Sequence, residues 1–462
     1  MTTDRWGNAM TAASQAAADR YSDTVYSYLE FRKDTGDCLK ALMAADADMP
    51  MAHVLRGYFF KLFAVPALEE RAKKGAVDAA AKADARGATP RERLHIAALA
   101  AWAAGDYAKT TALWDQIVTE HPRDMLAIRL SHFIQFYMGH SAPVRDSIAR
   151  VLPRWSETDP DIAFLHGMYA FGLEECGDYA AAEDYGRRAA AAHPNDTWSV
   201  HAVAHVLEMT GRHREGIRFL DGLEAHWSAC NNFRFHMGWH KALYLYELGQ
   251  FDACLALYDG QFRAEKTEEY LDLTNAIAML WRLEDRGVAL GDRWAELTER
   301  AGKHAGDLLM PFPDMHYVMA LAAGGKMDAA NGMVAAMRAL PDDPLQYERQ
   351  VLRTTGATLA AAITAYRAKN FGRAVDLLMP VRYSLQAIGG SHAQRDVFAL
   401  LLIEAAIRAQ RPALARALLA ERLALKPNSG VSWDSYGDVL TSLGERAGAA
   451  QAKQKAAEIR AV

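Results

Sequence analysis

Two His-x3-His pairs are the residues of this sequence whose types and spacing could do chemistry. His201 and His205 form one pair, and His236 and His240 form the other. One helical turn separates the imidazoles of each pair, so both can reach one metal ion, as in helical zinc sites. The pairs are 35 residues apart, and we expect them on neighbouring helices with the same side facing inward. These four histidines are therefore predicted ligands of one divalent metal ion: zinc, iron or manganese.

A carboxylate on the same helical face offers a second interpretation. Trp198, His201, His205 and Glu208 recur at i, i+3, i+7 and i+10, which places them on one side of a helix. In this interpretation His201, His205 and His240 are catalytic proton relays, and Glu208 is the general base or orients them. A third interpretation is packing, the more common fate of a histidine on a helix. No glutamate follows the first histidine as in the H-E-x-x-H motif, so the spacing leaves all three open.

The stretch GGSHAQRD gathers polar side chains where a loop is expected to enter a helix. Ser391 and Gln394 have the spacing of a capping box, and helix initiation alone would explain both. The functional alternative is a dense polar set at a helix N-terminus, where anions bind well. Under that alternative His392 and Asp396 are catalytic, and Gln394 and Arg395 bind substrate.

Two tryptophans and one aspartate complete the predicted site. Trp198 and Trp239 lie beside the histidines in the sequence and are predicted walls of a ligand pocket, with inter-helix packing as the alternative. Asp272 and Asn275, on the helix LDLTNAIAMLWRLE, are lesser candidates, and Asp272 is assigned to substrate binding. As an acid in the first helical turn, Asp272 would also be favoured by the helix dipole alone.

Helical hairpins are the elements that must position these residues. Residues 163–196 give an amphipathic helix, a Gly-Asp-Tyr turn at 177–179, a second helix and a stop at Pro194. This unit of 34 residues has the tetratricopeptide period. Residues 91–124 repeat the pattern, and similar turns recur along the chain.

The recurrence predicts an all-α fold, a tetratricopeptide-type α-solenoid of helical hairpins curled around a concave pocket. We expect one superhelix over 1–462 with about ten to twelve helix pairs. The stretches 286–313 and 379–394 interrupt the pattern and are predicted to be loop insertions. Loops that a solenoid does not need are candidates for function.

Several stretches carry a resemblance to a known family. They are HAVAHVLEMTGR (201–212), NFRFHMGWHKALYLYELGQFDACLALYD (232–259), LDLTNAIAMLWRLE (271–284) and PVRYSLQAIGGSHAQRDVF (380–398). Together with the opening DRWGNAMTAASQAAADRYSDTVYSYLEF, they resemble the tetratricopeptide repeat protein 38 family over nearly the whole chain. The resemblance implies an all-helical repeat fold and assigns no reaction.

Composition argues against several other classes of protein. The net charge is −5, so a nucleic-acid partner, which needs a basic face, is not expected. The N-terminus lacks a secretory signal, and no apolar stretch is long enough for a membrane span. Four scattered cysteines without a CxxC pair are typical of a reduced, cytoplasmic protein. The sequence contains neither a P-loop nor a G-x-G-x-x-G motif, so no nucleotide or dinucleotide cofactor is expected.

These observations predict an enzyme or small-ligand-binding protein whose site lies in the concave groove. Hydrolysis or related acid–base or metal-assisted chemistry is the most economical use of the predicted residues, with Arg395 holding an anionic group. The alternative is a scaffold whose open groove binds a peptide or protein, the usual role of this fold. A third reading is an oligomerisation module that forms a homodimer.

Overall fold

The computed structural model describes residues 2–461 and is almost entirely helical. Within that range the only strands are β1 (Thr2–Thr3) and β2 (Ala9–Met10), which pair antiparallel with Thr2 opposite Met10. The prediction of an all-α fold is therefore confirmed. None of the helices in these residues is both long and apolar enough to cross a membrane.

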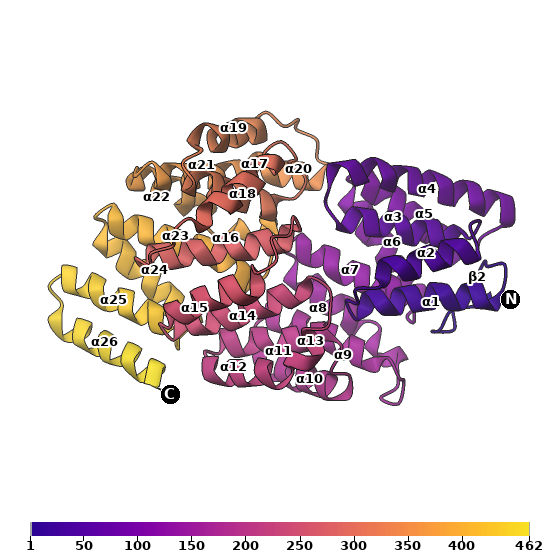
Figure 1. Cartoon of the computed structure of the whole chain (residues 1–462), viewed down its shortest axis with the longest axis horizontal. Coiled ribbons are helices and arrows are strands. Elements are labelled where there is room, and N and C mark those ends of the chain that lie inside the picture. The colour runs from indigo at the N-terminus through magenta and orange to yellow at the C-terminus, as the bar shows by residue number, and fades with distance from the viewer. Residues whose placement is uncertain (1, 462) are drawn as a thin grey trace. The chain divides into compact units, whose positions relative to one another are not determined.

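The helices divide into two compact units. The first extends to Val203 and includes His226–Asn231 and Pro341–Gln350, and the second holds Ala204–Ala225, Asn232–Leu340 and the chain from Val351 onward. The helices of the first unit (Figure 1) are α1 (Gln15–Leu29), α2 (Thr35–Ala45), α3 (Pro50–Leu62), α4 (Pro66–Arg86), α5 (Pro90–Ala103), α6 (Tyr107–Glu120), α7 (Met125–Tyr137), α8 (Ser141–Ala149), the 3-10 helix η1 (Leu152–Arg154), α9 (Ile162–Glu175) and α10 (Tyr179–Ala192).

The second unit contains the remaining helices, apart from three that run through the division. Those three are α11 (Thr197–Met209), α13 (Glu224–Trp227) and α20 (Tyr347–Val351). The others are α12 (His213–Gly222), α14 (Phe233–Glu247), α15 (Phe251–Leu257), the π-helix η2 (Tyr258–Phe262), α16 (Tyr270–Asp285), α17 (Arg293–His304), α18 (Pro311–Ala323), α19 (Met327–Arg338), the π-helix η3 (Leu352–Gly356), α21 (Ala357–Arg367), α22 (Phe371–Val381), the 3-10 helix η4 (Leu385–Ile388), α23 (His392–Arg408), α24 (Pro412–Leu425), α25 (Gly430–Ser442) and α26 (Arg446–Ala461).

The Gly-Asp-Tyr signals fall where helices end and begin. Gly177 has φ of 83°, a left-handed conformation that costs glycine little and that ends α9. Asp178 then caps α10 by accepting the backbone N–H of Ala181. The turn at Gly105 and Asp106 joins α5 to α6 in the same way. These boundaries agree with the predicted ones.

Consecutive helices pack in pairs within each unit. In the first unit α3 packs on α4, α5 on α6 and α9 on α10, and in the second α21 packs on α22 and α25 on α26. Small residues permit close approach: a Cβ on Gly186 of α10 would lie 2.7 Å from Val203 Cγ2 of α11. Successive helices thus form hairpins that bury their apolar faces on each other.

The expected loop insertion 286–313 is largely helical. It contains α17, whose Trp294, Leu297 and Ala301 are buried at helical spacing. Thr298 Oγ1 donates to the carbonyl of Ala320, which joins α17 to α18. The Gly-rich flanks of this stretch suggested a loop, whereas its apolar face forms a helix because it has a neighbour to pack against.

The second expected insertion, 379–394, is shorter than predicted. Helix α22 continues to Val381 with Pro380 in its last turn, and α23 already begins at His392. Proline is tolerated there because few residues of α22 follow it. The irregular stretch is therefore confined to the residues between these two helices, and part of it forms η4.

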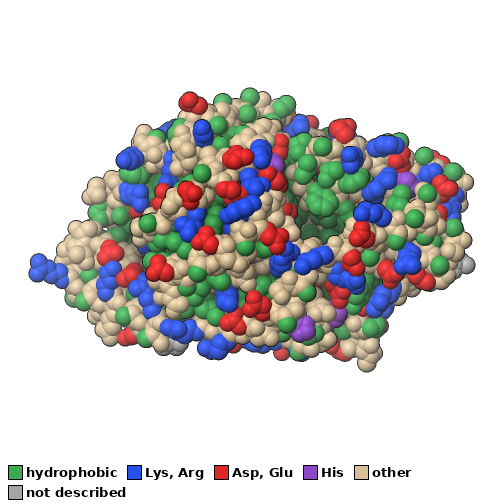
Figure 2. Space-filling view, in the orientation of Figure 1, with side chains coloured by type: hydrophobic (Ala, Val, Ile, Leu, Met, Phe, Trp, Pro, Cys, Tyr) green, Lys and Arg blue, Asp and Glu red, His purple; other side chains and the backbone are tan. Residues whose placement is uncertain are grey.

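Charged side chains of both signs are interspersed over the face shown in Figure 2. The sequence has 52 Lys and Arg against 57 Asp and Glu, so neither sign dominates. No field of one sign covers this face, and the view offers no basic stripe of the kind that nucleic acid binds.

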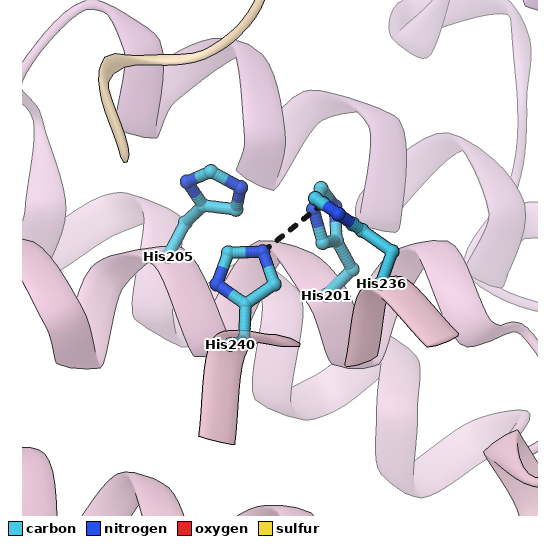
Figure 3. Close-up of side chains that lie close together, drawn as sticks. All are labelled: His201, His205, His236 and His240. Carbon is cyan, nitrogen blue, oxygen red and sulfur yellow. Dashed lines mark hydrogen bonds between the residues drawn. The ribbon is translucent and has the colours of Figure 1, made fainter. Parts of the chain in front are cut away.

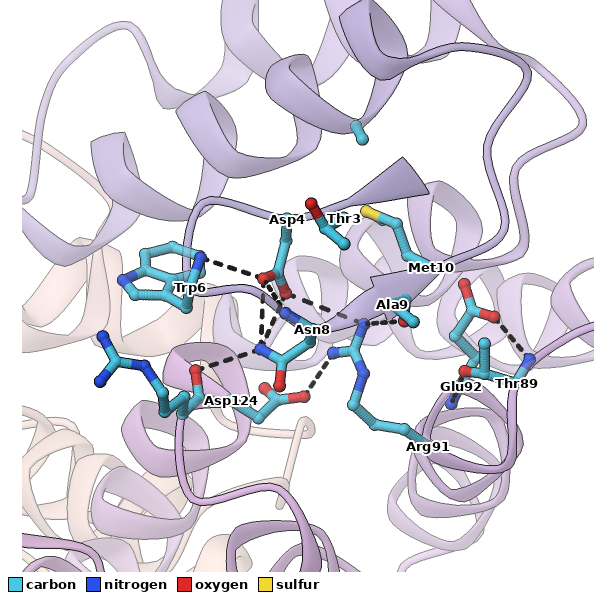
Figure 4. A network of polar contacts seen from close by, with 12 residues as sticks. Thr3, Asp4, Trp6, Asn8, Ala9, Met10, Thr89, Arg91, Glu92 and Asp124 are labelled. Atoms are coloured by element: carbon cyan, nitrogen blue, oxygen red, sulfur yellow. Dashed lines mark hydrogen bonds and ion pairs between the residues drawn. The ribbon is translucent and has the colours of Figure 1, made fainter. Parts of the chain in front are cut away.

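A buried ionic network fixes the N-terminal strands to the first unit (Figure 4). Arg91 of α5 donates to Asp124 Oδ2 at 2.5 Å and to the carbonyl of Ala9 at 3.2 Å, and its guanidinium lies 3.8 Å from Asp4. His95 contacts the same oxygen of Asp124 at 2.9 Å. Burial alone would raise the pKa of Asp124, but His95 and Arg91 hold it well below its usual range. The positive charge of Arg91 thus compensates the negative charges of two buried carboxylates, those of Asp4 and Asp124.

Replacing Arg91 with Met is expected to lower the free energy of unfolding by about 3–5 kcal/mol, because the carboxylates of Asp4 and Asp124 lose their buried cation. Urea unfolding at pH 7 measures the change. Arg93→Met is the matched control on the same helix, since exposed Arg93 pairs with exposed Asp84 at 3.5 Å. The control should change stability by no more than about 0.5 kcal/mol, and equal losses in both variants would contradict the role of Arg91.

Candidate metal centre

Helices α11 and α14 carry the four predicted histidines. Helix α11 follows Asp196, whose Oδ1 accepts a backbone N–H of the first turn at 3.2 Å. His201 and His205 lie one turn apart on this helix, which runs through the division between the units, so the helix itself fixes one relative to the other. Helix α14 carries His236 and His240 at the same spacing. The predicted helical placement of both pairs is confirmed.

The four imidazoles converge between these helices (Figure 3). One ring nitrogen of each lies within 4.8 Å of the others, and all four side chains are buried. His236 Nε2 and His240 Nε2 are 3.2 Å apart, close to the separation of about 3.4 Å between two ligands of a tetrahedral zinc ion. Any pair of ligand nitrogens that is wider than this tetrahedral separation would have to close through side-chain rotation when the ion binds.

Burial favours the neutral form of these histidines. The pKa of His205 lies well below its usual value because of burial and, secondarily, the proximity of His236, His392 and Lys426. Burial likewise lowers the pKa of His236 and of His240, and each is lowered further by a neighbouring histidine. A neutral imidazole has a lone pair, which a metal ion needs, so burial favours the charge state of His205, His236 and His240 in which metal binding is possible.

Asn275 of α16 orients the ring of His236. Its Oδ1 lies 3.1 Å from His236 Nδ1, so a proton on Nδ1 is donated to the amide and the Nε2 lone pair faces His240. Trp239 stacks on the same imidazole with ring centroids 5.2 Å apart and planes at 17°. A metal-binding histidine commonly donates its second nitrogen to such an acceptor, which fixes its tautomer. Trp239, a predicted pocket wall, is buried and restricts the imidazole of His236 by this stacking.

Glu208, predicted as the general base, forms a buried ion pair with Lys426. The ammonium group donates to Oε1 at 2.6 Å, and it also lies close enough to His205 and His240 to lower their pKa. The negative charge of Glu208 therefore compensates the buried positive charge of Lys426. Lys426 stands 218 residues further along the chain, and no sequence signal pointed to it.

Asp396, predicted as catalytic, is held by a second ion pair in the same unit. Both of its carboxylate oxygens accept from Arg422, with Oδ2 at 2.9 Å from Nη2. Burial would raise the pKa of Asp396, but Arg422 and Lys426 hold it well below its usual range. Arg422 also donates from Nε to Ser432 at 2.8 Å. Sequence reasoning missed Arg422, which lies on the apolar-patterned helix α24.

The capping box predicted at the start of α23 is present. The backbone N–H of Gln394 donates to Ser391 Oγ at 3.2 Å, and that of Ser391 donates to Gln394 Oε1 at 2.9 Å. Arg395 donates to the carbonyl oxygens of the two glycines that precede the cap. Gln394 and Arg395, predicted to bind substrate, therefore stabilise the loop and the helix start.

The remaining predicted residues lie at three other positions. Trp198 is buried and donates from Nε1 to His132 Nε2 at 3.2 Å. Asp272 accepts from Asn232 at 2.9 Å, and burial raises its pKa above the usual value. His392 is half-buried at the first position of α23, near enough to His205 to lower the pKa of that imidazole.

A surface cavity in the second unit is built from other residues than the four histidines. Its lining includes the charged side chains Arg282, Asp285, Arg286 and Glu404, with Trp281 and Tyr246 among the aromatic ones. Asp285 is paired with the Tyr366 hydroxyl at 2.6 Å, and burial raises its pKa to about 6. The cavity and the histidine cluster are therefore two separate features.

No protein-family model matches the chain. The resemblance found in the sequence stays a prediction, and the candidate site depends on burial and geometry.

The metal-free protein should lose stability as the pH falls below about 6.5. His205, His236 and His240 have lowered pKa values when folded, whereas in the unfolded chain they protonate near 6.5. Their contribution to the free energy of unfolding is complete above about pH 6.5. It declines by about 1.4 kcal/mol per pH unit for each histidine as the pH drops toward the pKa of that histidine in the folded protein. Urea unfolding between pH 7.5 and 5.5 measures this slope.

The variant His240→Gln separates this cluster from the other histidines of the chain. Its free energy of unfolding should change with pH less steeply than that of wild type, by up to about 1.4 kcal/mol per pH unit, because the variant lacks one titrating group. Parallel curves for wild type and variant would show that His240 does not titrate with a lowered pKa.

Proposed function

We propose that the protein is a metalloprotein that binds one divalent transition-metal ion through His201, His205, His236 and His240. The observation that carries the proposal is the convergence of four buried imidazole nitrogens within 4.8 Å of one another. Imidazole suits zinc and iron, and the lowered pKa values of His205, His236 and His240 favour their uncharged form at neutral pH. A packing role alone would not require four imidazoles at one contact.

The identity of the ion decides what the centre does. Zinc with four histidine ligands is tetrahedral and closed, which is the arrangement of a structural site. Iron or manganese accepts more ligands, so four histidines would leave positions for water and a small-molecule substrate. A water on such an ion becomes a nucleophile near neutral pH, which would supply the hydrolase-like chemistry expected from the sequence.

The fold that we propose for this centre is a tetratricopeptide-type α-solenoid. Residues with positive φ follow the first helix of successive hairpins at 105, 139, 177, 211, 249, 287, 325, 369, 410 and 444. The intervals between them are 34, 38, 34, 38, 38, 38, 44, 41 and 34 residues. Such a near-constant period, together with the pairwise packing of successive helices, supports a repeat architecture.

The stretches that resemble the tetratricopeptide repeat protein 38 family include the proposed ligands. The segment 201–212 contains His201 and His205, and the segment 232–259 contains His236 and His240. We propose membership of that family on this resemblance, with the metal centre as a property of these two segments.

Elemental analysis of protein purified without a histidine tag tests whether the protein binds a metal ion. We expect about one equivalent of zinc or iron per chain, and loss of most of it in His205→Ala and in His240→Ala, because each variant removes one ligand. His316→Ala is the matched control, since His316 is equally buried in the second unit but bonds to the carbonyl of Phe312 instead.

Metal retained in His316→Ala and lost in the two ligand variants would support the centre. Wild-type protein that carries no metal, and that takes up neither zinc nor iron after reconstitution, would rule it out. Circular dichroism of each variant shows whether a loss reflects the site or the fold.

Asn275→Leu is expected to weaken metal affinity by about 10–100-fold, because His236 loses the acceptor that fixes its tautomer. Asn275→Asp should retain or increase the affinity, since a carboxylate accepts the same Nδ1 proton more strongly. Competition with a chelator of known affinity measures both variants. Equal affinities for the two would show that Asn275 does not orient the ligand.

A further inference from the structure

Two carboxyl groups, those of Glu269 and Asp272, meet at the start of α16 in the second unit. Asp272 is 1% exposed, and Glu269 is partly buried at the N-terminal cap of the helix. The two side chains lie within hydrogen-bonding reach of each other. Two carboxylates that are held together away from water repel each other, so such a pair needs either a compensating cation or a proton.

Hydrogen bonds already occupy one oxygen of each carboxyl group. Asp272 Oδ2 accepts from Asn232 Nδ2 at 2.9 Å and from the hydroxyl of Thr267. Glu269 Oε2 accepts the backbone N–H groups of Leu271 at 3.0 Å and of Asp272 at 3.2 Å. Asp272 Oδ1 is buried, and no described residue donates a hydrogen bond to it. A buried acceptor without a donor is costly, and a proton on the other oxygen of Glu269 would supply that donor.

The two arginines nearest to the pair have carboxylate partners of their own. Arg263 and Arg234 lower the pKa of Asp272 through their positive charges. Arg263 donates from Nη2 to Glu296 at 2.5 Å, and Arg234 donates from Nη2 to Glu265 at 2.9 Å. Burial outweighs both charges, since the pKa of Asp272 remains raised above its usual value.

The other charged or titratable groups near the pair lie on α17, on α18 and in the segment before α16. Tyr317 of α18 interacts electrostatically with Glu269, and burial raises the pKa of its hydroxyl, so the hydroxyl is neutral. His304 of α17 stacks on Tyr317 with ring centroids 5.1 Å apart, and Arg300 of the same helix pairs with Glu268 at 2.5 Å. The acids that also act on Tyr317 are Glu268, Asp307 and Asp314.

We propose that Glu269 and Asp272 hold one proton between them, and that this shared proton fastens the start of α16 to the start of α14. Glu269 carries the proton on Oε1 and donates it to Asp272 Oδ1, because the second oxygen of each residue already accepts two hydrogen bonds. Asp272 then remains the acceptor for Asn232, the residue that precedes α14. Burial raises the pKa of both carboxyl groups, and the charge of Asp272 raises that of Glu269 further, which agrees with a proton retained at neutral pH.

Loss of the shared proton in alkali would release this contact between the helices. The two carboxylates then repel each other, and Glu269, the more exposed of the two, turns toward solvent and gives up the N–H groups of the first turn of α16. The hydrogen bond from Asn232 to Asp272 lies one turn before the contact of His236 with Asn275 on the same two helices. The shared proton thus makes the packing of α14 on α16 sensitive to pH.

The pH dependence of unfolding tests the shared proton. Carboxyl groups of the unfolded chain ionise near pH 4, so between that pH and the raised pKa the folded state binds more protons and loses stability as the pH rises. Urea unfolding of the full chain between pH 5.5 and 9 compares wild type with Glu269→Gln, whose amide donates to Asp272 at every pH. We expect the unfolding constant of wild type, divided by that of the variant, to rise by up to about tenfold per pH unit until the proton is lost.

Two further variants assign the effect to the pair. Asp272→Asn removes the same repulsion, so it should flatten the pH dependence as Glu269→Gln does, and the double variant should flatten it no further. Glu268→Gln is the matched control, because Glu268 adjoins Glu269 in the sequence but forms ion pairs with Arg300 and Lys303. The ratio of unfolding constants for this control should stay constant over the same pH range.

Hydrogen exchange followed by mass spectrometry locates the change. The peptide over residues 267–276 should lose protection in wild type between pH 6 and 9, after correction for the intrinsic pH dependence of exchange, and should keep it in Glu269→Gln. A constant ratio of unfolding constants for both Glu269→Gln and Asp272→Asn would overturn the proposal, as would equal loss of protection in wild type and Glu269→Gln. If Glu269→Gln does not fold, Asp272→Asn takes its place in both measurements. A chelator is present throughout, so the outcome does not depend on whether the histidines bind a metal.

Discussion

Ionisable side chains buried between helices must be uncharged or paired with a group of opposite charge, and the rest of this structure depends on that constraint. A charge isolated from water costs several kcal/mol, so each buried ionisable group needs either a lowered tendency to ionise or a partner. The imidazoles between α11 and α14 meet the constraint by staying neutral. Glu208 meets it through Lys426, and Asp396 meets it through Arg422. The same condition that permits burial leaves neutral imidazoles beside one another, which is why the packing arrangement resembles a metal site.

Two buried arginines of the first unit show the two ways of meeting this condition. Arg91 lies between Asp4 and Asp124, and its charge joins the N-terminal strands to α5 and α7. Arg129 faces aromatic rings in place of a carboxylate, and Tyr28 and Asp196 offset part of the effect of burial on its pKa. The first arrangement is complete within the chain and serves stability.

Rigid helices give the candidate centre its precision. Each pair of histidines has its spacing set by one helical turn, and stacking by Trp239 and the hydrogen bond to Asn275 restrict the ring of His236. The groups around the histidines would therefore influence a bound ion by fixing the tautomer of its ligands and by setting the local charge. Glu208 and Asp396 belong to this surrounding layer because cations already occupy their carboxylates.

The sequence by itself determined the helical class, the turns at Gly105 and Gly177 and the capping box of α23, because helix periodicity, left-handed glycines and caps are local properties. It also placed the two histidine pairs at helical spacing. It missed α17, since a short amphipathic segment between glycines becomes a helix only with a neighbour to pack on. Only the tertiary structure decided that Lys426 faces Glu208 and that Arg129 lies among three rings, because those partners come from distant segments whose approach no local pattern encodes.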